Sequence, residues 1–375
     1  MNKLLTVGPV YWLNQKGAII LLTVVLLLSI VTLVTLYTGK IQSFEHQIVI
    51  NTQNQQWAQA SAKAGLEHAL AILNVNKAWP NTEISGNLED DSTFIISGTT
   101  EHLSSHRQLI TIHSNGQSAD GLAKAIVIEQ SLIYPILFNR PPAPLMVKHG
   151  FDHHGEFELV VNPNGLGTAD PLSLWSDTAI TLSGTEHHSC ILIEFDAGNC
   201  STHSYSDHSK KLTDIADGST SFPIDLFAYL FNVAATDWHQ LQQQSDLLLA
   251  DCDTLDSTSW GVIWVHGDCD VGAGTQIGHS LEPIILIVYG GNVVFQSDVV
   301  MYGLLFVFKP SGSTKTLDIN MQTNSAVLGA VVTNYQLGTK SPSMRVVFQA
   351  DVMQRLQTSK KLQRVARVPG SWHDF

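Results

Sequence analysis

A long apolar run lies near the start of the chain. Residues 18–37 read AIILLTVVLLLSIVTLVTLY and include no charged side chain. A helix of that length measures about 30 Å, the thickness of the hydrocarbon core of a bilayer. Lys3 and Lys16 precede the run, and this positive charge predicts a cytoplasmic N-terminus and an exported body. We therefore expect a single transmembrane helix at 18–37.

A cleaved secretory signal is the alternative interpretation of this run. The apolar region of such a signal has about 7–15 residues and ends at a small-x-small cleavage site. The run in this chain is longer, and Thr38-Gly39-Lys40 matches such a site only weakly. A membrane anchor is therefore the preferred interpretation.

Helical periodicity continues beyond the anchor. The chain has no proline from residue 41 to residue 73. Small or apolar side chains recur there every three or four positions, as on one face of a helix, at Ala58, Ala62, Gly65, Ala69 and Leu73. The pattern predicts one helix that continues from the anchor and ends before Trp79-Pro80. Its small residues would let it approach a sheet closely.

Strand patterns follow this helix. The apolar or alternating segments are residues 94–97, 108–113 and 125–132. Asn115-Gly116 and Asp120-Gly121 are turn dipeptides and predict turns between the strands. We expect the strands to form a small sheet over the small-residue face of the helix. The Pro-rich residues 140–144 then predict a stiff connector and a domain boundary.

The last third of the chain is rich in β-forming residues. Its apolar runs are VIWVHGDCDV, IILIVYGGNVVF, VVMYGLLFVF, AVLGAVVTN and MRVVFQADV. Runs that are apolar on both faces, with no amphipathic helix between them, predict a parallel β-solenoid or a sandwich, and we favour the solenoid. Helices are predicted at residues 224–249 and 351–365.

These elements define an α+β fold in which a long N-terminal helix carries a small β-sheet and is followed by a β-rich domain. The expected organisation is a leader at 1–17, the transmembrane helix at 18–37, a stalk helix with its sheet at 38–139, a connector with irregular β-structure and a helical interlude at 140–258, a solenoid-like domain at 259–350, and a C-terminal helix with a basic tail at 351–375.

Composition and net charge restrict the kinds of partner that the chain can bind. The chain is 44% hydrophobic and 14% charged, which is enough apolar surface to form cores. Its formal net charge of −13 argues against general nucleic-acid binding, which needs a basic face. The basic residues are concentrated between Lys340 and Arg367. We expect no nucleic-acid partner.

Four cysteines suit one or two disulfides in an exported domain. Cys190 and Cys200 lie ten residues apart, and Cys252 and Cys269 lie seventeen apart. Pairing in sequence order is the simplest of three connectivities. Zinc is the alternative, but no C-x-x-C spacing is present.

Metal and catalytic motifs are missing from the sequence. The histidines at 153, 154, 187, 188, 203 and 208 follow no ligand spacing, so solvated loop residues are preferred over a metal site. Glu89-Asp90-Asp91 matches no calcium loop. The chain also lacks G-x-S-x-G, a phosphate-binding P-loop and H-E-x-x-H. We expect no enzyme, no metal and no cofactor.

The first residues resemble those of the type IV pilin and pseudopilin superfamily. A leader, MNKLLTVGPVYWLNQKG, ends in a basic residue and a glycine directly before the apolar run, and small residues follow in QASAKAGLE. Within the superfamily the chain is most similar to PilX-type pilus assembly proteins over residues 14–73. The resemblance implies cleavage between Gly17 and Ala18 by a prepilin peptidase.

Two positions depart from the superfamily pattern. Major pilins usually begin the mature chain with Phe and carry Glu at its fifth position, whereas this chain has Ala18 and Leu22. In the superfamily that Glu pairs with the N-terminal amine of a neighbour inside the filament, where an unpaired charge is costly. A subunit without it suits a tip or an initiating position, or does not enter the filament core.

The resemblance implies a non-catalytic minor pilin or pilus-assembly subunit of the inner membrane, with a periplasmic body, that primes or caps a type IV-like pilus. Its helix from Ala18 through Leu22 to Tyr37 would contact lipid and then other pilins and assembly proteins. Two alternatives stay open. One is a membrane-anchored envelope enzyme acting on polysaccharide, marked by a line of carboxylates and basic residues along one solenoid face. The other is a tip adhesin with exposed aromatics, for which the candidates are Trp175, Trp238, Trp260 and Trp264, although core packing is preferred for each.

Overall fold

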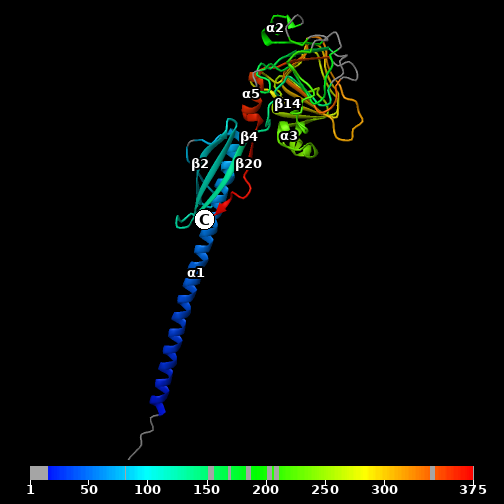
Figure 1. Cartoon of the computed structure of the whole chain (residues 1–375). Helices are drawn as coiled ribbons and strands as arrows, with labels where there is room; N and C mark the ends of the chain where they lie inside the picture. Colours follow the sequence, from blue (N-terminus) through cyan, green and yellow to red (C-terminus); the bar gives the residue numbers. More distant parts are fainter. Residues whose placement is uncertain are drawn as a thin grey trace, which may run out of the picture.

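The computed structural model describes residues 16–80, 82–150, 156–167, 170–182, 187–200, 205–206, 211–337 and 343–374. Figure 1 shows a long helical rod, a small sheet beside its upper part, and a larger β-rich body beyond that sheet. A long helix followed by β-structure confirms the expected α+β class.

The rod is one helix, α1 (Lys16–Asn76), of 61 residues. At about 1.5 Å per residue it is roughly 90 Å long. The polar residues 51–56 do not interrupt it, because nothing in this stretch removes a backbone donor as proline would. Within the apolar part, Ser and Thr hydroxyls such as those of Ser29 and Thr35 donate to carbonyls one turn back, so they leave no unpaired polar group for lipid.

The small sheet is antiparallel and joins the two ends of the chain. Its strand order is β1-β2-β3-β4-β20, with β21 also paired to β4. The strands are β1 (Ile84–Asn87), β2 (Thr93–Ser104), β3 (Arg107–Gln117), β4 (Lys124–Pro135), β20 (Gln363–Arg367) and β21 (His373–Asp374). Three strands of this sheet contain the predicted segments, whereas β20 and β21 come from residues that we expected to form a helix and a tail.

The predicted turn at Asn115-Gly116 is wrong. Both residues lie inside β3, opposite Ile95 and Phe94 of β2. The reason is packing against α1, since a Cβ at Gly116 would overlap the backbone of the helix. Glycine here marks a close approach of two backbones instead of a chain reversal.

The helix and the small sheet share one core. The small-residue face of α1, which consists of Ala58, Ala62, Gly65, Ala69 and Leu73, is buried, and Leu66 and Leu70 are buried beside it. Opposite them lie inward residues of the strands, including Phe94, Ile96, Ile110, Ile112 and Val127. The predicted contact between this helix face and the sheet is therefore present.

The body is built from parallel strands. They are β5 (Leu145–Val147), β6 (Glu156–Val160), β7 (Leu174–Ser176), β8 (His187–Cys190), β9 (Ile215–Ala216), β10 (Leu247–Leu249), β11 (Val262–His266), β12 (Cys269–Val271), β13 (Gln276–Ile277), β14 (Ile284–Tyr289), β15 (Val293–Phe295), β16 (Val300–Phe308), β17 (Ile319–Met321), β18 (Ala326–Thr333) and β19 (Ser343–Val347). One sheet has the order β10-β11-β14-β16-β18-β19-β6-β8, and a second has the order β12-β15-β17.

The stacking order does not follow the chain. Strand β18 pairs with both β19 and β5, and the segment from β5 to β9 continues the stack that β10 to β19 began. The chain therefore enters the stack in its middle at β5, builds one end, crosses to the other end at β10, and returns to the middle at β19. The whole body is inserted between β4 and β20 of the small sheet.

Short helices cover one face of the body. They are α3 (Leu226–Phe231), η2 (Ala235–Asp237), α4 (Trp238–Gln243), α5 (Ala350–Thr358) and η3 (Lys360–Leu362), while α2 (Leu192–Asp196) lies at the far end in Figure 1. Phe227 and Phe231 of α3 pack on Trp264 and Phe306 of the sheet. This cover explains why the strands are apolar on both faces.

Both helices predicted in the second half are shorter than expected. The segment 224–249 is broken because Asn232 ends α3 in the left-handed conformation, and Leu247–Leu249 pairs with β11 as β10. The helix at 351–365 ends at Thr358, because the following residues pair with the open edge of β4 as β20.

Candidate functional site

The candidate site for assembly is the bare half of α1. A window of this helix has a mean hydropathy of 3.0, and none of it is buried. The side chains of Leu22 and Tyr37 are 66% and 69% exposed. So continuous an exposed apolar surface is stable only against lipid or other protein. The helix is therefore long and apolar enough to cross a membrane.

The part of α1 between the apolar run and the small sheet is amphipathic. Ile41, Phe44 and Ile48 recur at helical spacing and are all exposed. A shallow groove of about 570 Å³ runs from Ile48 to the exposed Trp57. This surface continues the apolar rod toward the body and can contact a neighbouring helix.

The predicted processing residues lie at the start of this rod. Gly17 is exposed in the first turn of α1, and Ala18 follows it in the helix. The leader at 1–15 lies outside the described residues. The first acidic residue of the whole chain is Glu45. At about 1.5 Å per residue Glu45 lies roughly 40 Å from Ala18, so this chain brings no carboxylate of its own to that end.

The C-terminal strands fix the orientation of the rod. Arg367 of β20 donates to Glu67 of α1 and lies 3.6 Å from Glu129 of β4. Lys63 lies over the ring of Trp372, 5.8 Å from its centroid. Burial raises the pKa of the Glu129 carboxyl, an effect that the neighbouring Arg367 only partly offsets. The basic segment that the sequence presented as a tail thus ties α1 to the sheet.

A second set of contacts joins the small sheet to the body. Arg364 of β20 donates to Asp246 at 2.8 Å, just before β10. Gln357 of α5 donates to the carbonyls of Leu137 and Phe138, in the segment between β4 and β5. Because these groups are largely buried, fixed contacts hold the small sheet and the body together.

Two disulfides stabilise the body. Cys190 pairs with Cys200, with 5.2 Å between their Cα atoms, and closes the loop that contains α2. Cys252 pairs with Cys269, with 4.9 Å between their Cα atoms, and joins the segment after β10 to β12. Neither pair leaves a thiol for metal binding or catalysis.

A buried carboxylate at one end of the body is structural. Asp214 is fully buried and accepts hydrogen bonds from the hydroxyls of Ser173, Ser189 and Ser206 at 2.6–2.7 Å. These donors satisfy the charge that burial would otherwise make costly. The hydrogen bonds from the three serines account for the burial of Asp214 without a bound ligand.

The residues considered as metal ligands do not form a site among the described parts of the chain. In the ranges covered by the structure, no three His, Cys, Asp or Glu side chains gather as a metal site. His153, His154, His203 and His208 lie outside those ranges. Among the tryptophans, Trp175 and Trp264 are buried in the core, whereas Trp260 is 40% exposed and lies under Lys361.

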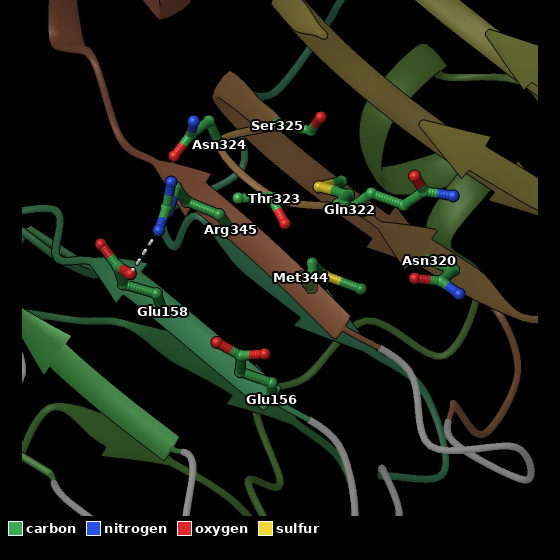
Figure 2. A pocket seen from close by; sticks show the side chains of 10 residues that line it. Glu156, Glu158, Asn320, Gln322, Thr323, Asn324, Ser325, Met344 and Arg345 are labelled. Atoms are coloured by element: carbon green, nitrogen blue, oxygen red, sulfur yellow. Dashed lines mark hydrogen bonds and ion pairs between the residues drawn. The ribbon is translucent and has the colours of Figure 1, made fainter. Parts of the chain in front are cut away.

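A polar hollow on the body was not predicted from the sequence. It has a volume of about 410 Å³, and its lining comes from β6, β17, β19 and the turn after β17. Figure 2 shows Arg345 bonded to Glu158, at 3.0 Å, and Glu156 lying apart from that pair. Glu158 and Arg345 are 187 residues apart in sequence, so only the stacking of β6 on β19 could reveal them.

Comparisons with known proteins add little to this geometry. No protein-family model and no curated protein matches the chain. Among solved structures, the competence-associated pilin ComZ from Thermus thermophilus matches at 12% identity over 86% of this chain and 97% of that chain, with a TM-score of 0.26. A TM-score this low is below that of a shared fold, so the comparison supports no structural argument.

Proposed function

We propose that the protein is a minor pilin or pilus-assembly subunit, anchored in the inner membrane, that primes or caps a type IV-like pilus. One observation carries the proposal. A single 61-residue helix has a bare apolar half, and near its other end a face rich in alanine is buried against an antiparallel sheet. The sequence resemblance at residues 14–73 points to the same class.

The mechanism we infer is physical. The apolar half of α1 is stored in the bilayer, where lipid covers its side chains. On assembly the same surface exchanges lipid for the helices of other pilins, and van der Waals packing then supplies the stability. The amphipathic stretch from Ile41 to Trp57 extends this contact toward the body.

The position that suits this subunit is an end of the filament. Leu22 stands where the superfamily carries Glu, and the first acid is Glu45. Without that carboxylate, the amine of a neighbour's N-terminus would be buried unpaired. The bulk of the body also favours an end, since it is inserted beside the small sheet and extends beyond it (Figure 1).

We further propose that the body is a parallel β-solenoid. Inward residues of successive strands stack in register, as in Ile263, Leu286, Leu305 and Val331. The turn residues repeat too: Gly274, Asp298 and Asn324 all have positive φ, and Asn324 donates to Asp298 at 3.0 Å. Regular stacking of this kind makes a rigid platform.

The remaining expectations belong to the same proposal. Prepilin peptidase would cut between Gly17 and Ala18, and lipid and other pilins would be the partners of α1. The body would be periplasmic, an oxidising compartment that suits both disulfides. An enzyme acting on polysaccharide is less well supported. Arg345 is paired with Glu158, and among the described residues that line the polar hollow no second unpaired carboxylate lies beside Glu156.

Counting filaments tests the proposed function. Deleting the gene should reduce pilus number, and the wild-type chain should restore it. A chain with Leu27→Arg should fail to restore it, because an arginine at the centre of the anchor costs about 2.5 kcal/mol or more on insertion scales. The matched control is Leu27→Val, which keeps the apolar surface. Wild-type pilus number in the deletion strain would contradict the proposal.

A further inference from the structure

The polar hollow of Figure 2 lies at a step in the body. The sheet β12-β15-β17 ends at β17, whereas the neighbouring sheet continues through β19 and β6. The step leaves about 410 Å³ open, within the range of about 300–1,000 Å³ that is usual for small-molecule sites. The hollow is therefore a consequence of how the two sheets end.

Part of the lining is held rigidly. Ser325 donates to the Gln296 carbonyl, and Asn324 donates to Asp298 at 3.0 Å. Arg345 is bonded to Glu158 and also lies 6.0 Å from the ring centroid of Phe195. These contacts hold Ser325, Asn324 and Arg345 in place before any ligand binds.

The other part of the lining is free to bind. Among the described residues, the side chains of Asn320, Gln322, Thr323 and Glu156 make no hydrogen bond or ion pair with the protein. Carboxamides and hydroxyls both donate and accept, so they match ligands that carry several neighbouring hydroxyl groups. Displacing water from such groups costs little when a ligand offers equivalent hydrogen bonds.

The composition of the lining restricts the ligand further. Among the lining residues that the structure describes, none is aromatic, and methionine supplies the apolar surface. An apolar peptide or a lipid chain would therefore gain little there. Glu156 leaves one negative charge after Arg345 neutralises Glu158, so an anionic ligand would be repelled.

We propose that this hollow binds a short stretch of a neutral or amino-substituted polysaccharide. The carboxamides of Asn320 and Gln322 bond to sugar hydroxyls, and Glu156 pairs with an amino group where one is present. This binding function goes beyond the proposed role in pilus assembly and does not depend on it. It also needs no catalytic step.

Calorimetric titration of the full-length protein in lipid nanodiscs tests the proposal, since nanodiscs contain no glycoside detergent that would compete. The probes are maltohexaose, chitosan hexamer and hexagalacturonate. Saturable binding of the first two and none of the third is expected. Tightest binding of hexagalacturonate, or no binding of any probe, would overturn the proposal.

Variants locate the binding. Gln322→Ala and Asn320→Ala should each weaken binding about tenfold, the effect of one lost hydrogen bond. Gln354→Ala is the matched control, because this residue is exposed on α5 at the rim of another hollow. Glu156→Gln should remove the preference for chitosan hexamer over maltohexaose. Unchanged affinity in the first two variants, with unchanged melting temperature, would overturn the assignment.

Discussion

At the scale of single residues, glycine and alanine decide how closely the rod meets the small sheet. A Cβ at Gly116 would overlap backbone atoms of Ala58 and Ala62, and neither can move without displacing α1. A Cβ at Gly65 would be crowded by the side chains of Ser114 and Phe94. The sequence showed the small-residue face of the helix but presented Gly116 as a turn residue, because a glycine in a close contact and a glycine in a turn have the same local signature.

Gly116→Ala should therefore destabilise the small sheet by about 1–3 kcal/mol through overpacking. Chemical denaturation followed by the fluorescence of Trp79, which is buried in this core, would measure the change. Gly272→Ala is the control, since a Cβ there meets no atom closer than 3.9 Å. Equal stability of the two variants would contradict the close contact.

A second prediction at the residue scale concerns how the stability of the protein depends on pH. Glu129 is 4% exposed, and burial raises its pKa. The native state therefore binds this proton more tightly than the unfolded state, so the contribution of Glu129 to stability falls as the pH rises through its pKa. Glu129→Gln should be more stable than the wild type at pH 7, with the advantage lost below about pH 4, near the ordinary pKa of Glu.

Unfolding free energies of the Glu129 variant at several pH values would show this trend. Glu67→Gln is a suitable comparison, since Glu67 also contacts Arg367 but is exposed. A Glu129 variant that is less stable at pH 7 would mean that the pairing with Arg367 outweighs burial.

At the scale of elements, the sequence predicted those whose pattern is local. The long helix, the strands β2, β3 and β4, and the five apolar runs of the last third all lie where their periodicity placed them. The failures have long-range causes. Leu247–Leu249 reads as helical until it meets β11, and Gln363–Arg367 becomes a strand only because β4 offers an open edge more than two hundred residues away.

The polar hollow could not be predicted from the sequence, for the same reason. Glu156 and Glu158 come before the chain crosses to β10, whereas Asn320 and Arg345 come near the end of the chain. A stack that the chain enters at its middle brings them together, and no sequence spacing records that topology.

The resemblance of residues 14–73 to PilX-type pilus assembly proteins stays a prediction.

Removing each of the two disulfides should affect stability in a different way. Cys252 and Cys269 are buried in the central core, so replacing both with alanine should cost about 3 kcal/mol for a loop of 17 residues. Replacing Cys190 and Cys200 should act mainly on the exposed α2 loop, where Ile193 is 77% exposed. Hydrogen exchange combined with denaturation would separate a global from a local loss. Identical exchange patterns in the two double variants would contradict this distinction.

At the scale of the whole molecule, the inserted body is fixed to the stalk by the end of the chain. β20 completes the small sheet, and Arg364 and Arg367 reach Asp246 and Glu67 on either side of it. Figure 1 shows the C-terminus beside α1, at the lower end of the small sheet. A force applied to the body is thus transmitted to the rod through paired strands instead of through a flexible linker.

Ending the chain after Leu362 should therefore loosen this junction. The loss of β20 removes the pairing along Ser131–Pro135, directly before the segment 136–144, in which Leu137 and Ala143 are fully buried. Limited proteolysis should then cut the connector, which the intact chain protects. Ending the chain after Gly370 removes β21 but keeps β20, and it should leave the connector protected. Equal resistance of both truncations would contradict the bracing role of β20.

The central claim is that α1 leaves the membrane and enters a filament as a pilin stalk. Mass spectrometry of sheared, purified pili tests it most directly. The account predicts a low number of copies of this chain in the filament fraction, each beginning at Ala18. A chain that is absent from the filaments and remains in the membrane with Met1 intact would contradict the account.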